Sequence, residues 1–201
     1  MAYQSVWYFT DIPSDVINII ETDIKEYFDS SLENSKLHEG VIDTNRRKSK
    51  NTWIPTTHWV SGFLWHYVMM ANRENFLYDL KNIDAEKLQY TVYQEGNFYD
   101  WHNDAGLQNA YVPSNSDIHG NFIQENCELV RKLSFSLQLS DPEDYEGGQL
   151  QLLDEEGKSY IAPKRKGSLI LFDSRTPHRV RKVTRGIRKS IVGWVVGPRW
   201  K

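Results

Sequence analysis

The stretch Lys132-Leu-Ser-Phe-Ser-Leu-Gln-Leu139 alternates apolar and polar side chains. Successive side chains of an extended chain point to opposite faces, so this alternation predicts a β-strand with one apolar face. That face would consist of Leu133, Phe135, Leu137 and Leu139. Asp141-Pro142 ends the strand, and Gly147-Gly148 makes a tight turn into the next apolar run, residues 149–153.

Further short strands are expected on both sides of this pair. The character of the chain changes to strands from Leu88 onward. Residues 168–172 predict a buried strand, and residues 188–196 predict the last one. Several short strands separated by Gly and Pro, without helices between them, are typical of a sandwich or jelly roll.

The first part of the chain predicts two helices instead. After Pro13 and Ser14, which suit a helix start, an apolar stripe recurs at helical spacing: Val16, Ile19, Ile20, Ile24 and Tyr27. A second stripe at steps of three and four comprises Trp59, Phe63, His66 and Met70. Residues 34–50 between them are polar and basic and predict a loop or short strands. We therefore expect one structural domain, in which a helical segment (1–86) packs on a β core (87–201).

Residues 105–131 form a long polar stretch with few periodic apolar residues. A loop of that length in a compact domain is more often functional than idle. It directly follows His102 and Asp104, so we expect a lid, and residues 108–126 within it would help to select a substrate.

Composition excludes several classes of protein. The 201 residues include seven tryptophans and 13% aromatic residues, which argues against disorder. A net charge of −3 gives no support for general nucleic-acid binding. The single cysteine, Cys127, fits a reducing compartment. No signal peptide or membrane span is expected from the sequence, and the oligomeric state stays open. A cytoplasmic protein is the expectation.

Three residues carry metal-binding chemistry: His102, Asp104 and His178. Two imidazoles and one carboxylate hold non-haem Fe(II) on one face and leave the opposite positions open for a co-substrate and O₂. Arg188 follows ten positions after His178, and its planar fork suits the far carboxylate of a dicarboxylic acid. The pattern predicts an oxygenase that depends on Fe(II) and 2-oxoglutarate.

An ordinary interpretation competes with this one. A bare H-x-D arises often by chance, and His178 follows Pro177 in what could be a simple turn. Residues 102 and 104 would, however, face the same side at a strand end, and a jelly roll brings distant strands together. We therefore favour the metal site. The other histidines have ordinary structural or surface roles, except that His119 in the expected lid is a candidate substrate contact.

Five ordered motifs resemble the Fe(II)/2-oxoglutarate oxygenases of the prolyl 4-hydroxylase type, including bacterial and phage-borne hydroxylases. The resemblance covers roughly residues 88–200. The motifs are Tyr93-x-x-Gly96-x-x-Tyr99-x-x-His102-x-Asp104, Arg131-Lys132-Leu133-Ser134, Tyr145-Glu146-Gly147-Gly148-x-Leu150, Gly167-Ser168-x-x-x-Phe172, and His178-x-Val180-x-x-Val183-Thr184-x-Gly186-x-Arg188.

The resemblance implies a double-stranded β-helix with packed N-terminal helices. It makes His102, Asp104 and His178 the iron ligands, and it implies that Arg188 and Tyr93 bind the C5 carboxylate of 2-oxoglutarate. Fe(II), 2-oxoglutarate, O₂ and ascorbate as reductant would be required. Asp173-Ser174 departs from the Pro-Ser of many relatives, so the rim of the site is expected to differ.

The favoured substrate, by family analogy, is a prolyl group, hydroxylated with release of succinate and CO₂. Trp101, Tyr99 and His119 are candidate substrate contacts. The same chemistry on a nucleobase or another small molecule is an alternative, and residues 46–50 with Trp53 are its support. A non-catalytic jelly-roll binding module and a zinc hydrolase are two further alternatives. The analogy with phage-borne enzymes extends the expected location to the interior of an infected host cell.

Overall fold

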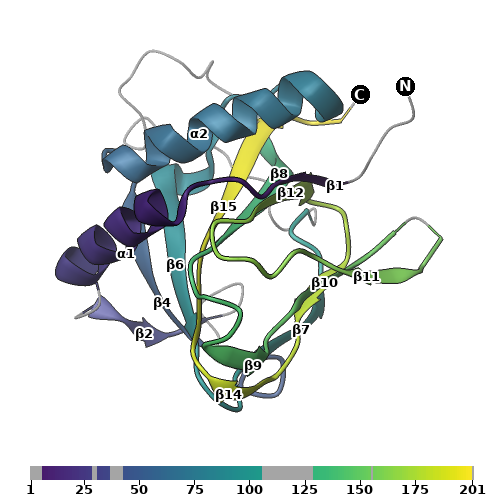
Figure 1. Cartoon of the computed structure of the whole chain (residues 1–201). Helices are drawn as coiled ribbons and strands as arrows, with labels where there is room; N and C mark the ends of the chain where they lie inside the picture. Colours follow the sequence, from purple (N-terminus) through teal and green to yellow (C-terminus); the bar gives the residue numbers. More distant parts are fainter. Residues whose placement is uncertain (1–5, 29–30, 37–42, 106–128, 155, 201) are drawn as a thin grey trace.

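The computed structural model describes residues 6–28, 31–36, 43–105, 129–154 and 156–200, and in these ranges the chain is mainly β (Figure 1). The larger sheet has eight strands, and all its pairings are antiparallel. In spatial order they are β1 (Val6–Phe9), β12 (Leu169–Asp173), β8 (Leu129–Gln138), β15 (Arg188–Pro198), β6 (Lys87–Tyr93), β4 (Lys50–Pro55) and β2 (Glu33–Asn34), while β5 (Asn82–Ile83) pairs with β15.

A second, five-stranded sheet carries two of the three predicted metal ligands, His102 and His178. Its strands, in spatial order, are β11 (Ser159–Ile161), β10 (Leu150–Leu153), β13 (His178–Val180), β7 (Phe98–His102) and β3 (Arg47–Lys48). A separate pair consists of β14 (Val183–Gly186) and β9 (Tyr145–Gly147). The expected jelly roll is confirmed.

Two α-helices, α1 (Ser14–Phe28) and α2 (Trp59–Ala71), lie on the outer face of the larger sheet (Figure 1). A π-helical turn, η3 (Asn72–Phe76), continues α2, and a 3-10 turn, η4 (Asp84–Glu86), precedes β6. Neither helix of the described ranges has the length and apolar character needed to cross a membrane.

The larger of two apolar clusters fills the space between the helices and the eight-stranded sheet. The predicted apolar face of β8 lies in it: Leu133, Phe135, Leu137 and Leu139 are all fully buried. The smaller cluster lies inside the jelly roll and includes Tyr93, Leu152, Phe172 and Val180. The core therefore separates the helices from the inner faces of the two sheets, where the site lies.

Both helices occur where the sequence predicts them. The buried face of α2 differs from the prediction, whereas in α1 the predicted Ile20 and Ile24 are buried and Ile19 is not. In α2 the buried stripe is Val60, Leu64, Val68 and Ala71, whereas Trp59 and His66 are exposed. In α1 it is Ile17, Ile20 and Ile24, and Ile19 is 61% exposed. Both helices carry apolar residues on more than one side, so spacing alone did not determine which side faces the sheet.

The expected helical segment over residues 1–86 also contains strands, and only β3 lies wholly within residues 34–50, where a loop or short strands were predicted. Five short strands from this segment, β1 to β5, join the two sheets, so the segment is part of the jelly roll's framework. Of the expected lid, residues 129–131 belong to β8, and residues 106–128 lie outside the described residues.

Candidate active site

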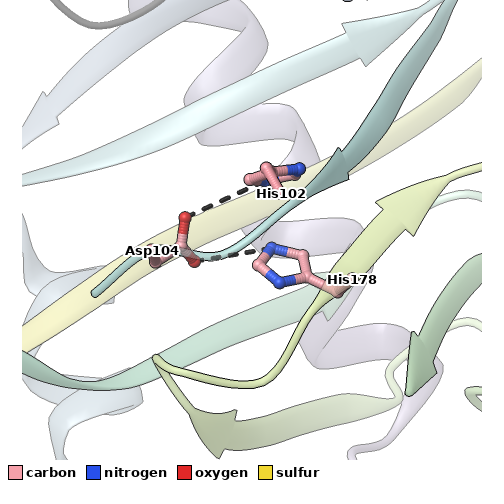
Figure 2. A group of neighbouring side chains, drawn as sticks. All are labelled: His102, Asp104 and His178. Atoms are coloured by element: carbon pink, nitrogen blue, oxygen red, sulfur yellow. Dashed lines mark ion pairs between the residues drawn. The ribbon is translucent and has the colours of Figure 1, made fainter. Parts of the chain in front are cut away.

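Strand pairing brings the three predicted metal ligands together. His102 ends β7 and lies directly opposite His178, the first residue of β13. Asp104 follows two residues after His102, and its backbone N–H donates to the carbonyl of Ser174 at 2.8 Å. One ligating atom from each of the three side chains lies within 4.8 Å of the others. Figure 2 shows the carboxylate facing both imidazoles.

Both imidazoles are held by main-chain carbonyl groups. Nδ1 of His102 is 2.7 Å from the carbonyl oxygen of Asp100, and Nδ1 of His178 is 2.9 Å from that of Thr176. A carbonyl only accepts, so Nδ1 carries the proton in each ring and Nε2 presents its lone pair. Each Nε2 faces Asp104, at 3.8 Å from Oδ1 for His102 and 3.5 Å from Oδ2 for His178. This arrangement orients both rings for a metal.

Electrostatics keep His102 and Asp104 in the protonation states that a metal ion needs. Burial, reinforced by the nearby His178, lowers the pKa of His102 to about 3. Burial alone would raise the pKa of Asp104, but His178 and then His102 outweigh it, so this pKa is lowered from its usual value. At neutral pH the site therefore offers a neutral His102 ring and an ionised carboxylate.

Two buried serines, Ser134 and Ser174, hold Asp104 in place. Ser134 on β8 donates its hydroxyl hydrogen to Oδ2 at 2.6 Å, and its Oγ lies 3.0 Å from Oγ of Ser174. Ser174 also accepts the Asp104 backbone N–H, as described above. These contacts fix both the main chain and the side-chain orientation of Asp104.

A stack of three side chains supports His102 from the other side. The ring of Tyr99 lies parallel to the imidazole, with 3.6 Å between centroids and 17° between planes. The guanidinium of Arg47 lies over the opposite face of Tyr99, 4.6 Å from its centroid. Arg47 is buried and donates to Gln89 Oε1 at 2.8 Å and to Ser49 Oγ at 3.1 Å. The stack thus connects His102 to the larger sheet.

The three residues open into a cavity of about 430 Å³ between the sheets, which Arg188 and Tyr93 also line. Arg188 and Tyr93 are paired across β15 and β6, and the Arg188 guanidinium carbon is 5.5 Å from the Tyr93 ring centroid. Arg188 is 3% exposed and donates to Ser190 Oγ at 3.3 Å. In the described part of the chain no ion pair joins it to a carboxylate. A buried, unneutralised guanidinium favours an anionic ligand.

The candidate substrate contacts divide into three cases. Tyr99 lines the cavity and stacks on His102. Trp101 is not among the cavity-lining residues, and the guanidinium of Arg179 lies 4.6 Å from its ring centroid. His119 lies outside the described residues. Sequence reasoning missed Ser134 and Arg47, because only the register of strands far apart in the chain brings them to the site.

The donor set fits Fe(II). Two imidazole nitrogens and one carboxylate oxygen converge on one side, and the cavity opens beside them, which leaves room for a co-substrate. The serine and carbonyl contacts described above are the kind of outer partners that orient metal ligands.

Comparison with known proteins gives the class. Residues 88–196 match the family model described as the 2OG-Fe(II) oxygenase superfamily. The match covers more than half of the chain, and this protein belongs to that superfamily.

The relatives narrow the comparison further. A PKHD-type hydroxylase of Synechococcus sp. (strain JA-2-3B'a(2-13)) is 50% identical over 70 residues, which are 34% of this chain and 30% of that protein. The PKHD-type hydroxylase Xfasm12_1709 of Xylella fastidiosa (strain M12) is 30% identical over 147 residues, 72% of this chain and 60% of that protein. The matches thus span between 30% and 60% of the length of these two relatives.

A solved structure shares the fold. It is a prolyl hydroxylase in complex with a hypoxia inducible factor oxygen degradation domain peptide fragment from Trichoplax adhaerens. The TM-score is 0.74 at 19% identity, and the alignment covers 95% of this chain and 83% of that one. At this identity the likeness concerns the fold.

Proposed function

We propose that this protein is an Fe(II)- and 2-oxoglutarate-dependent dioxygenase that hydroxylates an unactivated C–H bond, most specifically in a prolyl residue of a peptide or protein. One observation carries the proposal: a metal-binding trio and a buried, unneutralised arginine line the same cavity. A metal ion would occupy the trio, and a dicarboxylic acid in the same cavity would neutralise Arg188. A zinc hydrolase would leave Arg188 without a role.

His102, Asp104 and His178 would hold Fe(II) through two Nε2 atoms and a carboxylate oxygen. Arg188 would grip the C5 carboxylate of 2-oxoglutarate, and the hydroxyl of Tyr93 would donate to the same group. The bound iron supplies O₂ activation, so that one oxygen atom enters succinate, formed with CO₂, and the other becomes the hydroxyl of the product. The protein orients the reactants through the serine and carbonyl contacts of the ligands.

The substrate proposal draws on the relatives. Two are named hydroxylases, and the structural neighbour is a prolyl hydroxylase bound to a peptide. A peptide with a prolyl residue is therefore the substrate class that we propose. Ascorbate would keep the iron reduced between turnovers, and a reducing cytoplasm, which the single cysteine suits, is the proposed location.

The experiment measures succinate formation by the purified protein with Fe(II), ascorbate, 2-oxoglutarate and O₂. We expect slow turnover in the wild type even without substrate. His178→Ala should abolish it, because the metal loses an imidazole ligand. Arg188→Ala should raise the 2-oxoglutarate concentration needed for half-maximal turnover at least tenfold, because the charge-assisted pair is lost.

Arg179→Ala is the matched control. Arg179 hydrogen-bonds to Gln151 and is not among the cavity-lining residues, so its removal should leave the 2-oxoglutarate requirement unchanged. If the metal-loaded wild type neither binds 2-oxoglutarate nor forms succinate, the oxygenase proposal is wrong and a non-catalytic binding module takes its place.

A further inference from the structure

The cavity extends sideways beyond the metal-binding trio. We call the residues of this extension the basic wing: Lys36, Arg46, Arg47, Arg131, Trp53 and Trp194. The hydrogen bond from Arg47 on β3 to Gln89 on β6 crosses between the two sheets there. Trp53 on β4 is paired with Gln89, and Trp194 on β15 and Arg131 on β8 continue the wing across the larger sheet.

The wing extends from the trio in a different direction from the co-substrate, because Trp194 lies opposite Ser134 of β8 whereas Arg188 is the first residue of β15. Asp104 is held by Ser134 on β8, and in the larger sheet β15 and β6 separate β8 from β4. Three strand spacings amount to about 14 Å. The co-substrate would extend from the trio to Arg188 on β15. The chemistry of the wing is therefore available to the substrate.

Charge in the wing is one-sided. Among the described residues that line the whole cavity, Asp104 is the only carboxylate, and it belongs to the metal site. Arg131 is neutralised by Asp84 at 2.6 Å. Within the described ranges, no ion pair joins Lys36, Arg46 or Arg47 to an acidic group. Three positive charges at one end of the cavity thus lack a described counter-charge.

Arg47 makes this more than a solvated basic surface. It is only 7% exposed, and it donates hydrogen bonds to neutral acceptors of Gln89, Ser49 and the Lys36 carbonyl. A buried guanidinium surrounded by neutral partners favours a nearby anion. Lys36 and Arg46 are exposed beside it and would add to the attraction.

The wing also has an aromatic wall. Trp53 and Trp194 lie with ring centroids 6.4 Å apart, and the guanidinium of Arg131 covers Trp194 at 4.2 Å. Trp53 is 45% exposed and offers an apolar surface. A ligand that combines a negative charge with apolar parts matches these features.

We propose that the basic wing binds an acidic side chain of the peptide substrate. This inference rests on the proposed function and adds a substrate requirement to it. Through Tyr99, the Arg47 guanidinium lies within about 8 Å of the His102 ring, and β4 lies about 14 Å from β8. With the hydroxylated residue at the trio, these distances correspond to roughly two to four residues of extended peptide. The preferred substrate carries Asp or Glu two to four residues from the hydroxylated position.

A peptide suits the wing better than a nucleic acid does. Binding to nucleic acid depends on neutralising several phosphates along an extended surface, whereas this chain has a net charge of −3 and the wing's free charges gather at one cavity. One or two carboxylates need no such surface, and an arginine fork matches their geometry.

The test uses fluorescein-labelled peptides with a central proline and the full chain loaded with Fe(II) and 2-oxoglutarate without O₂. One peptide carries Asp or Glu two to four residues away on each side of the proline, and its partner carries Asn or Gln there. Fluorescence anisotropy should show at least tenfold tighter binding of the acidic peptide. Lys36→Glu/Arg46→Glu should abolish or reverse this preference. The preference is a ratio of two affinities measured on the same preparation, so it does not depend on the fraction of the variant that is folded.

Lys48→Glu/Lys50→Glu is the matched control. It changes the net charge equally, and both side chains are exposed and are not among the cavity-lining residues. The control variant should keep the preference for the acidic peptide. A preference lost equally in both double variants would reflect general electrostatics and would overturn the proposal.

Three further results would overturn it. Equal affinity of the two peptides in a wild type that binds 2-oxoglutarate would refute the acidic subsite and leave the proposed function intact. Tighter binding of a single-stranded oligonucleotide than of the acidic peptide, lost in Lys36→Glu/Arg46→Glu, would assign the wing to a nucleobase substrate instead. A metal-loaded wild type that does not bind 2-oxoglutarate, as measured beforehand by absorbance, would overturn the proposed function and this inference together.

Discussion

Ser134 is the side chain on which the orientation of Asp104 most directly depends. Main-chain carbonyls orient the two histidines, so no single side-chain replacement removes those acceptors. The carboxylate instead relies on the hydroxyl of Ser134, which is fully buried. Without that hydrogen bond the carboxylate can rotate away from the position that the metal requires.

Ser134→Ala should weaken metal binding about tenfold, because the outer partner of a metal ligand is lost. Titration of the apoprotein with Co(II), followed by visible absorbance, measures the change directly. Ser168→Ala is the control, since Ser168 is also fully buried and its hydroxyl has no hydrogen-bond partner in the described structure. Equal Co(II) affinities in the two variants would show that Ser134 does not position Asp104.

Sequence reasoning reached the residues of the site unevenly. The sequence identified four residues of the site: His102, Asp104, His178 and Arg188. Two histidines, an aspartate and an arginine in this pattern indicate a metal ion and an anionic ligand, and few other roles account for all four together. Ser134 carries no such signal, since serine is common on strands. Its role depends on the short distance between β8 and Asp104, two residues after β7, and only the three-dimensional fold defines that distance.

At the scale of elements, the turn after β9 depends on backbone geometry that only glycine adopts readily. Gly147 has φ +71°, and a Cβ there would lie 2.0 Å from the carbonyl oxygen of Lys182. Lys182 directly precedes β14, the partner of β9. This close approach lets β9 and β14 pair at one end of the jelly roll (Figure 1).

Gly147→Ala should lower the free energy of unfolding by about 3 kcal/mol, because it combines a left-handed backbone with a clash that forces the main chain to shift. Gly157→Ala is the matched control: Gly157 has φ +79°, but no atom lies within 4 Å of its added Cβ. Only the backbone preference opposes that change, at about 1 kcal/mol. Urea unfolding of the two variants compares them, and similar losses would exclude the clash as the cause.

The elements differ in how far the sequence could predict them. The face of β8 was predicted correctly because a period of two leaves one choice once the apolar side is known. The face of α2 was wrong, since aromatic and aliphatic residues surround that helix and only its contact with the sheet selects Val60, Leu64 and Val68. β1 was missed, because four residues near the N-terminus show no period, and their pairing with β12 is a tertiary contact.

At the scale of the whole molecule, a cluster around Trp200 fastens the end of β15 to distant segments. The Lys132 ammonium lies 3.5 Å and the Arg175 guanidinium carbon 4.0 Å from the Trp200 ring centroid, and Tyr78 packs edge-on at 4.7 Å. Asp173 connects the cluster, because its Oδ2 accepts a hydrogen bond from the Tyr78 hydroxyl at 2.6 Å and another from the Arg175 guanidinium at 2.6 Å. Asp173 immediately precedes Ser174, so the cluster borders the metal site.

The aspartate at position 173 has a measurable consequence for the stability of the protein. Burial would raise the pKa of Asp173, but hydrogen bonds from Arg175 and Tyr78 outweigh burial and lower it. Because the pKa in the folded state is depressed, the stabilisation is present above the unfolded-state pKa. It is lost as pH falls through the lower folded-state value.

Asp173→Asn should therefore reduce the free energy of unfolding at pH 7 by about 2 kcal/mol, the size of hydrogen bonds to a charged group. The difference from wild type should shrink as the pH falls below about 4, where the unfolded-state carboxylate becomes protonated. Urea unfolding between pH 3 and pH 7 measures it. Asp79→Asn, which removes an exposed ion pair with Lys81, should change little at any pH. A pH-independent loss in Asp173→Asn would contradict this account.

The attachment of both imidazoles to main-chain carbonyls has a consequence for how such a site is inherited. The acceptors belong to Asp100 and Thr176, but any amino acid at these positions would supply the same oxygen. Genetic drift at the two codons therefore leaves the rings in place, and selection need act only on a few ligating side chains. A lineage can then remodel the cavity walls, and with them its choice of substrate, while the metal centre passes unchanged from ancestor to descendant.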